Sequence, residues 1–178
     1  MLNLYITDLK AYNENSLVGR WVSLPKIEQE LVLDVKGILE CGETSTGSSN
    51  HEEWFITDYE WDEISLFDVD EYADIYKLNH QLQLLEELQT YELKSIAYLI
   101  DAGIAISIED ALEKLDDVVI HEEQTMIDVA YNFIHEYYDI DKQPYLLRTH
   151  IDYEGIARDM ELEGNYTTMG SDTFEYIG

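Results

Sequence analysis

Carboxylates are the side chains through which this sequence could most readily do chemistry. Its 178 residues include 39 Asp and Glu against 10 Lys and Arg, which gives a formal net charge of −29. Residues 1–36 hold five acids and four bases, whereas residues 37–76 hold twelve acids and no Lys or Arg. Such a charge repels nucleic acids and anionic membranes, so the expected partners are cations or the basic grooves of other proteins.

Other catalytic and metal-binding patterns are scarce. The sequence has no nucleophile-elbow serine, phosphate-binding loop, dinucleotide fingerprint, CxxC pair or HExxH motif. Its five histidines lack the spacing of metal ligands. The run Asp68–Asp74 begins like a calcium loop, but Ala73 replaces the glycine of the sixth position and Asn79 replaces the glutamate of the twelfth. We therefore expect no catalytic residue, no metal and no cofactor. A carboxylate-based hydrolase is an alternative without specific support, because so many acids form close pairs by chance.

The first 61 residues have the pattern of a small α+β domain with a three-stranded antiparallel sheet. Alternating or aromatic runs predict strands over Leu2–Thr7, Leu17–Leu24 and Trp54–Tyr59. Apolar residues at helical spacing predict a helix over Lys26–Leu39. The small polar residues of Cys41–His51 predict a loop after it.

Residues 62–116 have a helical pattern and predict a central, acidic helical bundle. Helices are expected over Val69–Leu88, Glu92–Asp101 and 108–115, and Ser107 is a suitable N-cap for the last of them. Tyrosines at helical spacing in this region are interpreted as core residues rather than as a ligand-binding box.

Residues 117–178 return to a mixed pattern and predict a second α+β domain. The expected elements are a strand over Val118–His121, a helix over Glu123–Tyr138, a helical turn after Pro144, a helix over 153–161 capped by Asp152, and a hairpin of Tyr166–Met169 with Thr173–Ile177. The predicted fold class is thus α+β, with three small domains, 1–61, 62–116 and 117–178.

Two further features concern the cellular compartment. The single cysteine, Cys41, excludes an intramolecular disulfide framework. No basic segment followed by an apolar stretch opens the sequence, and no run of 18 apolar residues occurs. We expect a cytoplasmic protein.

The placement of the acids favours mimicry of DNA over a solubility coat. The acids occupy a contiguous stretch of the chain rather than being interleaved with Lys, and they alternate with apolar core positions on predicted helices. Residues four apart on a helix are separated by about 6 Å along its axis, which is comparable to the spacing of neighbouring phosphates along a DNA strand. A charge of −29 matches that of about 50 Å of duplex, roughly 15 base pairs. An acidic globular module that binds another basic or DNA-binding protein is the alternative. The candidate partner-binding carboxylates are Asp58, Glu60, Asp62, Glu63, Asp68, Asp70, Glu71, Asp74, Glu86, Glu87, Glu92, Asp101, Glu109, Asp110, Glu113, Asp116, Asp117, Glu122 and Glu123.

Two stretches of the sequence resemble a known family. The first is Leu4-Tyr5-Ile6-Thr7-Asp8-Leu9 with Tyr12-Asn13-Glu14 and Leu17-Val18-Gly19-Arg20-Trp21, and the second is Ile151-Asp152-Tyr153-Glu154 with Ala157-Arg158-Asp159-Met160-Glu161-Leu162. Between them, Phe55-Ile56-Thr57-Asp58-Tyr59-Glu60 and Val119-Ile120-His121 occur in the same order. In these residues the chain resembles the ArdA-type antirestriction proteins of mobile genetic elements. The Cys41–His51 segment departs from the family by its length and low acidity.

The resemblance implies a fold, a partner and an assembly. Members are elongated, curved homodimers with three small domains per chain. They occupy the DNA-binding groove of Type I restriction–modification enzymes, formed by the specificity and methyltransferase subunits, and thereby protect incoming unmodified DNA. The dimer forms through the C-terminal domain. Carried over to this chain, the implied interface comprises Val118, Val119, Ile120, Met126, Val129, Ala130 and Phe133.

Overall fold

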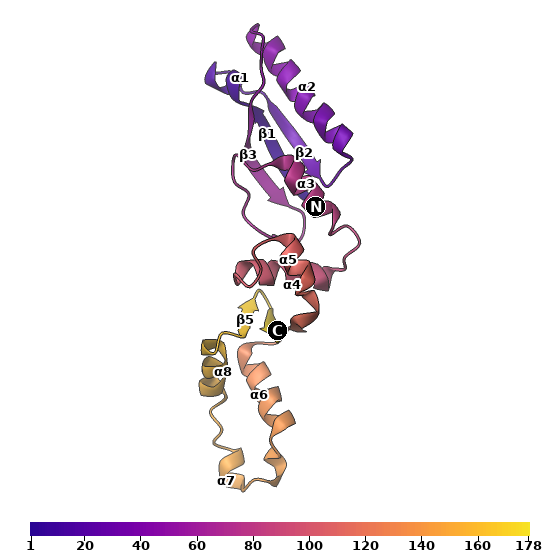
Figure 1. Cartoon of the computed structure of the whole chain (residues 1–178). Coiled ribbons are helices and arrows are strands. Elements are labelled where there is room, and N and C mark those ends of the chain that lie inside the picture. The colour runs from indigo at the N-terminus through magenta and orange to yellow at the C-terminus, as the bar shows by residue number, and fades with distance from the viewer. The chain divides into compact units, whose positions relative to one another are not determined.

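The computed structural model describes residues 1–178 and groups them into two compact units, Met1–Gln89 and Thr90–Gly178. Each unit contains one three-stranded antiparallel sheet with helices packed beside it (Figure 1). The α+β class predicted from the sequence is confirmed. The division into three domains stays a prediction.

The first unit is built on the sheet β2-β1-β3. Strand β1 (Leu2–Asp8) lies in the centre, β2 (Gly19–Leu24) and β3 (Trp54–Trp61) flank it, and the short helix α1 (Leu9–Asn13) follows β1. Along β1, Leu2, Leu4 and Ile6 are fully buried, whereas Asn3 and Tyr5 are half-buried. This alternation assigns one face of the sheet to the core and leaves the other face accessible.

Helix α2 (Glu28–Thr46) covers the apolar face of this sheet. It buries Leu31, Val35 and Ile38. The helix continues seven residues beyond the predicted end at Leu39, so the loop prediction for Cys41–His51 is wrong over residues 41–46. In this part of the helix Gly42 is buried against the Asp8 side chain. A larger residue at this position would collide with that side chain. Gly47, at φ 70°, then ends the helix in the left-handed conformation that glycine adopts readily.

The segment after β3 differs from the predicted long helix over Val69–Leu88. Residues 62–74 run as a loop, and helix α3 spans only Ile75–Gln83. The Asp74 carboxylate accepts hydrogen bonds from the N–H groups of Tyr76 and Lys77, which starts the helix at this point. The side chain of Asn79 bonds to both the N–H and the carbonyl of Lys26, so α3 is tied to the turn before α2.

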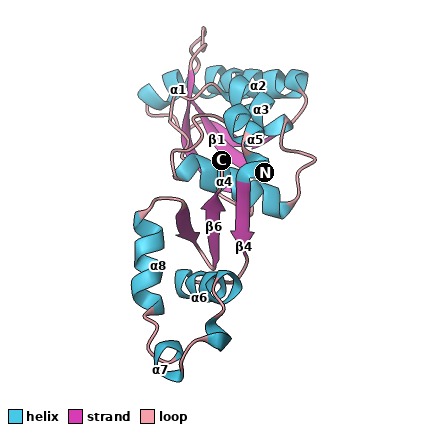
Figure 2. Ribbon diagram, turned by 60° about the horizontal axis from the view of Figure 1, so that its bottom comes forward, coloured by secondary structure: helices cyan, strands magenta, loops and turns pink.

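The second unit begins with the helices α4 (Thr90–Asp101) and α5 (Ile108–Glu113), followed by the 3₁₀ turn η1 (Leu115–Asp117). Its sheet has the order β4-β6-β5, with β4 (Val118–His121) at one edge, β6 (Asp172–Tyr176) in the centre and β5 (Tyr166–Met169) at the other edge (Figure 2). The strand Val118–His121 and the closing hairpin were predicted from the sequence and are confirmed. Side-chain stacking of Tyr98 on Phe174, with ring centroids 5.1 Å apart, packs α4 against this sheet.

Between β4 and β5 the chain forms two longer helices, α6 (Met126–Tyr137) and α8 (Tyr153–Leu162), with the short η2 (Ile140–Lys142) and α7 (Tyr145–Arg148) between them. A small core of Met126, Val129, Ala130, Ala157 and Met160 joins α6 to α8. Thr125 and Asp128 form a capping box on α6, and Asp152 caps α8 as predicted. No helix of the chain combines the length and the apolar character needed to cross a membrane.

Candidate acidic interaction surface

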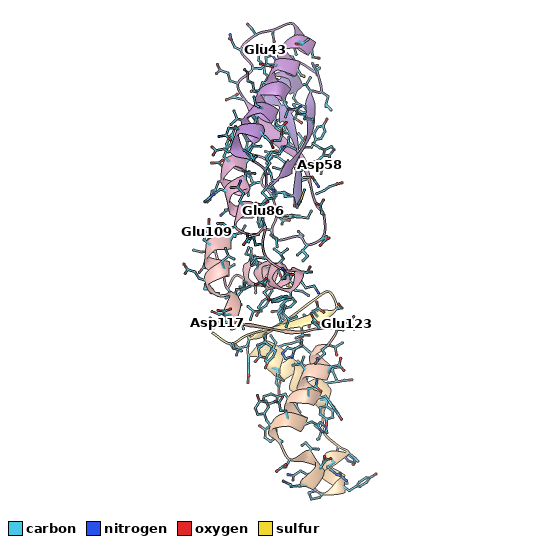
Figure 3. The ribbon with its side chains drawn as sticks, turned by 90° about the vertical axis from the view of Figure 1, so that its right-hand side faces the viewer. Glu43, Asp58, Glu86, Glu109, Asp117 and Glu123 are labelled. Carbon is cyan, nitrogen blue, oxygen red and sulfur yellow. The ribbon has the colours of Figure 1, made fainter.

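The nineteen carboxylate residues predicted to bind a partner all lie at the surface. Sixteen are exposed, and Glu92, Asp110 and Asp117 are partly exposed. Figure 3 labels Asp58 and Glu86 in the first unit, and Glu109, Asp117 and Glu123 in the second. It also labels Glu43, an acid outside the predicted set. Both units therefore carry exposed acids that could contact a basic partner.

The charge is shared almost equally between the units. Residues 1–89 contain 19 acids and five bases, and residues 90–178 contain 20 acids and five bases. Several of the bases are paired with acids outside the predicted set: Arg20 and Lys26 with Asp34, and Lys36 with Glu40. Most of the predicted set between residues 58 and 74 therefore has no cationic partner to offset its charge. The exception is Asp62, whose carboxylate lies 3.5 Å from the N-terminal ammonium.

The acidic loop 62–74 is fastened to strand β3. Ile56 N–H donates to the Glu71 carbonyl at 2.8 Å, and the Trp61 indole N–H donates to the Phe67 carbonyl at 3.2 Å. The Tyr59 hydroxyl donates to Asp68 Oδ1 at 3.0 Å, and this hydrogen bond is the main reason that the pKa of Tyr59 is raised. These bonds order carboxylates that would otherwise spread apart by mutual repulsion.

Backbone groups, rather than cations, hold the carboxylates that resembled the start of a calcium loop. Asp70 Oδ1 accepts from the N–H of Tyr72, and Asp74 Oδ1 caps α3. No group of three or more His, Cys, Asp or Glu residues is arranged to hold a metal ion. The loop therefore displays charge in a fixed geometry and does not form a cation cage.

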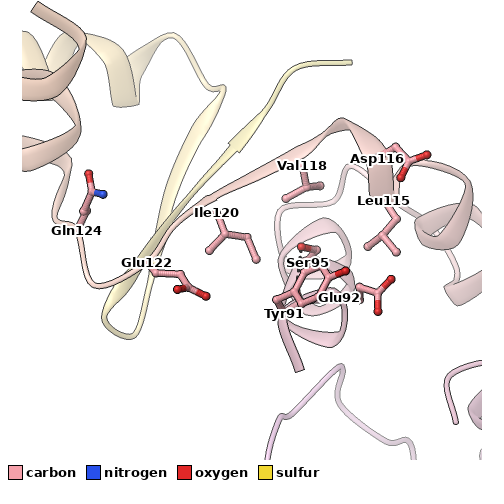
Figure 4. A pocket seen from close by; sticks show the side chains of 9 residues that line it. All are labelled: Tyr91, Glu92, Ser95, Leu115, Asp116, Val118, Ile120, Glu122 and Gln124. Carbon is pink, nitrogen blue, oxygen red and sulfur yellow. Dashed lines mark hydrogen bonds between the residues drawn. The ribbon is translucent and has the colours of Figure 1, made fainter. Parts of the chain in front are cut away.

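In the second unit, most of the predicted carboxylates lie on α5 and η1 and in the turn after β4, and Glu92 and Asp101 lie on α4. Asp110 accepts hydrogen bonds from Ile106 N–H and from the Lys114 ammonium, and these bonds lower the pKa of Asp110. Between α4 and β4 lies a cavity of about 540 Å³. Figure 4 shows its lining: Tyr91, Glu92, Ser95, Leu115, Asp116, Val118, Ile120, Glu122 and Gln124. Three of these nine are acidic, so the cavity continues the electronegative surface.

An ion pair between a buried carboxylate and a partly exposed lysine supports this acidic region. Asp172 is 4% exposed, and its carboxylate accepts from the Glu123 N–H at 2.9 Å and from the Lys94 ammonium at 2.6 Å. The bond from Glu123, and then that from Lys94, lowers the pKa of Asp172. The hydrogen bond with Asp172 in turn raises the pKa of Lys94. The pair joins α4, the start of β6 and the turn after β4.

The residues of the implied dimer interface fall into two groups. Met126, Val129 and Ala130 are buried in the core between α6 and α8 of the same chain. Val118, Ile120 and Phe133 are partly buried, and Val119 is 37% exposed on β4. Because β6 bonds to only one side of β4, the other side of this strand offers free backbone groups.

A network centred on His51 was not foreseen from the sequence. His51 Nδ1 lies 2.5 Å from Asp8 Oδ2, and His51 Nε2 lies 3.0 Å from Ser48 Oγ, with both the His51 and Asp8 side chains fully buried. The order Asp–His–Ser is that of a hydrolytic triad. Here, however, the Ser48 hydroxyl is bonded to the Glu14 carboxylate, which would repel a developing oxyanion. The network joins α2 to the end of β1, and we assign it a structural role.

Comparison with known proteins assigns nearly the whole chain to one family. A family model described as antirestriction protein (ArdA) matches residues 4–175 of the 178. No curated protein matches the chain. The family match includes most of β1, most of β6 and every candidate carboxylate between them. The chain therefore belongs to the ArdA family of antirestriction proteins.

Proposed function

We propose that this protein is a cytoplasmic, non-catalytic DNA mimic that occupies the DNA-binding groove of Type I restriction–modification enzymes. By filling the groove formed by the specificity and methyltransferase subunits, it would protect incoming mobile DNA from cleavage. The observation that carries the proposal is the surface position of all nineteen candidate carboxylates, sixteen of them exposed. Family membership supplies the antirestriction context.

The local geometry supports mimicry because regular secondary structure sets the spacing of the carboxylates along the backbone. On β3, Asp58 and Glu60 are separated by one residue and are both exposed. Side chains two positions apart on a strand lie about 6.6–6.8 Å apart, a spacing close to that expected of neighbouring phosphates. On α5, Glu109 and Glu113 are four residues apart, or about 6 Å along the helix axis. A basic groove can thus meet charges at regular intervals on either type of element.

The free energy of binding would come largely from displaced counterions and from Lys and Arg of the groove. The mimic offers no phosphodiester bond to cleave and no bases to read. Inhibition should therefore be stoichiometric and should weaken as the salt concentration rises.

The homodimer is part of this proposal. Strand β4 is an edge strand, and pairing of two copies of β4 would satisfy its free backbone groups. The exposed Val119 lies on this strand, whereas Met126, Val129 and Ala130 are buried in the core between α6 and α8 of each chain. Two chains at −29 each carry the charge of roughly 30 base pairs of duplex.

Competition with DNA tests the proposal. Labelled target duplex is bound to a Type I restriction–modification enzyme, and the protein is added at several salt concentrations. We expect release of DNA near stoichiometric protein in low salt and a higher requirement as salt rises. Duplex that stays bound at a large excess of protein in low salt contradicts the proposal. Equal release from unrelated basic DNA-binding proteins would favour the more general acidic binding module.

A further inference from the structure

The first sheet has one face that no helix of its unit covers. Helix α2 packs on the side of Leu2, Leu4 and Ile6. The opposite face carries the alternate residues of all three strands, and the strand register places them in two rows. One row runs Trp21, Tyr5, Asp58, and the other runs Ser23, Asn3, Glu60.

This open face differs from an ordinary polar sheet surface in carrying an exposed tryptophan. Trp21 is 44% exposed, and its ring meets that of Tyr5 edge-on with centroids 5.3 Å apart. The Tyr5 hydroxyl donates a hydrogen bond to the Gly19 carbonyl oxygen at 3.1 Å. Tyr5 therefore holds the indole in place, while part of the indole surface stays open to solvent.

Carboxylates line the other edge of the same face. Asp58 and Glu60 are exposed on β3, and Asn3 donates a hydrogen bond to Asp62 at 2.8 Å, which adds a third acid beside Glu60. Neighbouring strands lie about 4.8 Å apart, so Trp21 and Asp58 at the two ends of one row are separated by about 10 Å. The neighbouring cation Arg20 points to the opposite face, where it binds Asp34.

We propose that this open face is a docking surface for arginine side chains of a basic partner. A guanidinium stacks on an indole through cation–π attraction and pairs with a carboxylate through two parallel hydrogen bonds. The ammonium group of lysine pairs with a carboxylate less specifically than a guanidinium does, and it is more strongly hydrated. The face offers both an indole and a carboxylate within one row of the sheet, and its acids complement the charge of a positive partner. The inference rests on the proposed function for the identity of that partner, a DNA-binding protein. The preference of the face for arginine can be measured without that partner.

The direct test compares two peptides of equal charge on the full-length protein. Hexa-arginine and hexa-lysine are titrated at fixed ionic strength, while the indole N–H resonance of Trp21 is followed by NMR. We expect hexa-arginine to bind about two- to five-fold more tightly, as an exposed cation–π contact allows, and to shift the Trp21 signal. Equal affinities, or an unmoved Trp21 signal when other resonances shift, overturn the proposal.

Matched variants separate stacking from charge. Trp21→Leu should remove the preference for arginine, whereas Trp21→Phe should keep part of it; a preference that survives in Trp21→Leu overturns the role of the indole. Thermal melting shows whether each variant is folded. Asp58→Asn with Glu60→Gln should weaken both peptides more than Glu28→Gln with Glu30→Gln, a change of equal charge on α2. Equal weakening by the two pairs overturns the role of the open face.

The restriction enzyme separates this inference from the proposed function. If wild-type protein displaces DNA and Trp21→Leu does so equally well, the open face does not bind arginines of the enzyme, and the proposal of DNA mimicry is retained. If wild-type protein does not displace DNA but retains its arginine preference through Trp21, the proposed partner is wrong and the arginine face stands.

Discussion

At the scale of single residues, a few buried polar groups hold the acidic surface in place. Asp8 and His51 join the end of β1 to the segment after α2, and Asp172 and Lys94 join α4 to the second sheet. A buried carboxylate requires hydrogen bonds or a charged partner. Their partners are distant in sequence, so a periodic pattern of apolar residues contains no trace of them.

Gly42 is the residue on which the Asp8–His51 pair depends most directly. A Cβ at this position would lie 1.9 Å from Asp8 Oδ2 and 2.8 Å from His51 Nδ1. Gly42→Ala should therefore lower the free energy of unfolding by about 1–3 kcal/mol, measured by urea denaturation. The control is Gly37→Ala in the same helix, whose nearest neighbour is the flexible end of Arg20. That change should be neutral or stabilising, since alanine favours helix. Equal losses at both positions would contradict the steric argument.

Asp172→Asn should reveal a pH-dependent contribution to stability. The pKa of Asp172 is lowered in the folded protein, so its contribution is complete above the ordinary carboxyl pKa of about 4 and is lost as pH falls through the folded pKa. The pKa of Lys94 is raised, so its contribution is complete below about pH 10 and is lost as pH rises through the folded pKa.

We expect the wild type to be more stable than Asp172→Asn by about 1–3 kcal/mol between roughly pH 5 and pH 9, because charged hydrogen bonds are lost. The difference should shrink in acid, and urea denaturation at several pH values measures it. A difference that stays constant down to pH 2 would show that the carboxylate charge does not matter. Asp101→Asn, at an exposed acid of α4, is the matched control.

At the scale of elements, the strands and the helices capped by Ser107 and Asp152 could be predicted, and the ends of several other elements could not. Val118–His121 and the closing hairpin follow from short β-branched and aromatic runs, although β4 pairs with the distant β6 rather than with a neighbour in sequence. The helix expected over Val69–Leu88 begins only at Ile75, because residues 62–74 bond to β3 instead. Its apolar spacing was equally compatible with a loop whose side chains pack on a strand.

Val119→Asp tests the proposed pairing through β4. Val119 is exposed on the edge strand, and two facing aspartates would repel each other in a β4–β4 contact. Sedimentation velocity should show a shift toward monomer at concentrations where the wild type is dimeric. Val32→Asp, at a 46% exposed position of α2, makes the same change elsewhere and should leave the profile unaltered. An unchanged profile for Val119→Asp would remove β4 as the interface.

At the scale of the whole molecule, the dominant property is a charge spread across both units. No single acid is expected to dominate, because the attraction arises from many carboxylates that act together on a basic groove. Singly neutralised variants such as Glu71→Gln should weaken displacement of DNA only slightly and reduce the slope of log K against log salt by about one or less. A variant with five such changes across 58–74 should lose most of the salt dependence attributable to this region. One single substitution that abolishes inhibition would instead indicate a localised site.

The sequence by itself determined the charge, the fold class and the family. These depend on composition, on local periodicity and on ordered motifs at both ends of the chain, all of which can be read without knowing distant contacts. Only the tertiary structure decided which surfaces remain available. It placed Met126, Val129 and Ala130 in a core within the chain. It also left Trp21 and Asp58 in one row of an open sheet face. The reason is that strand register and helix packing join residues dozens of positions apart, and these contacts determine whether a side chain faces a core or a partner.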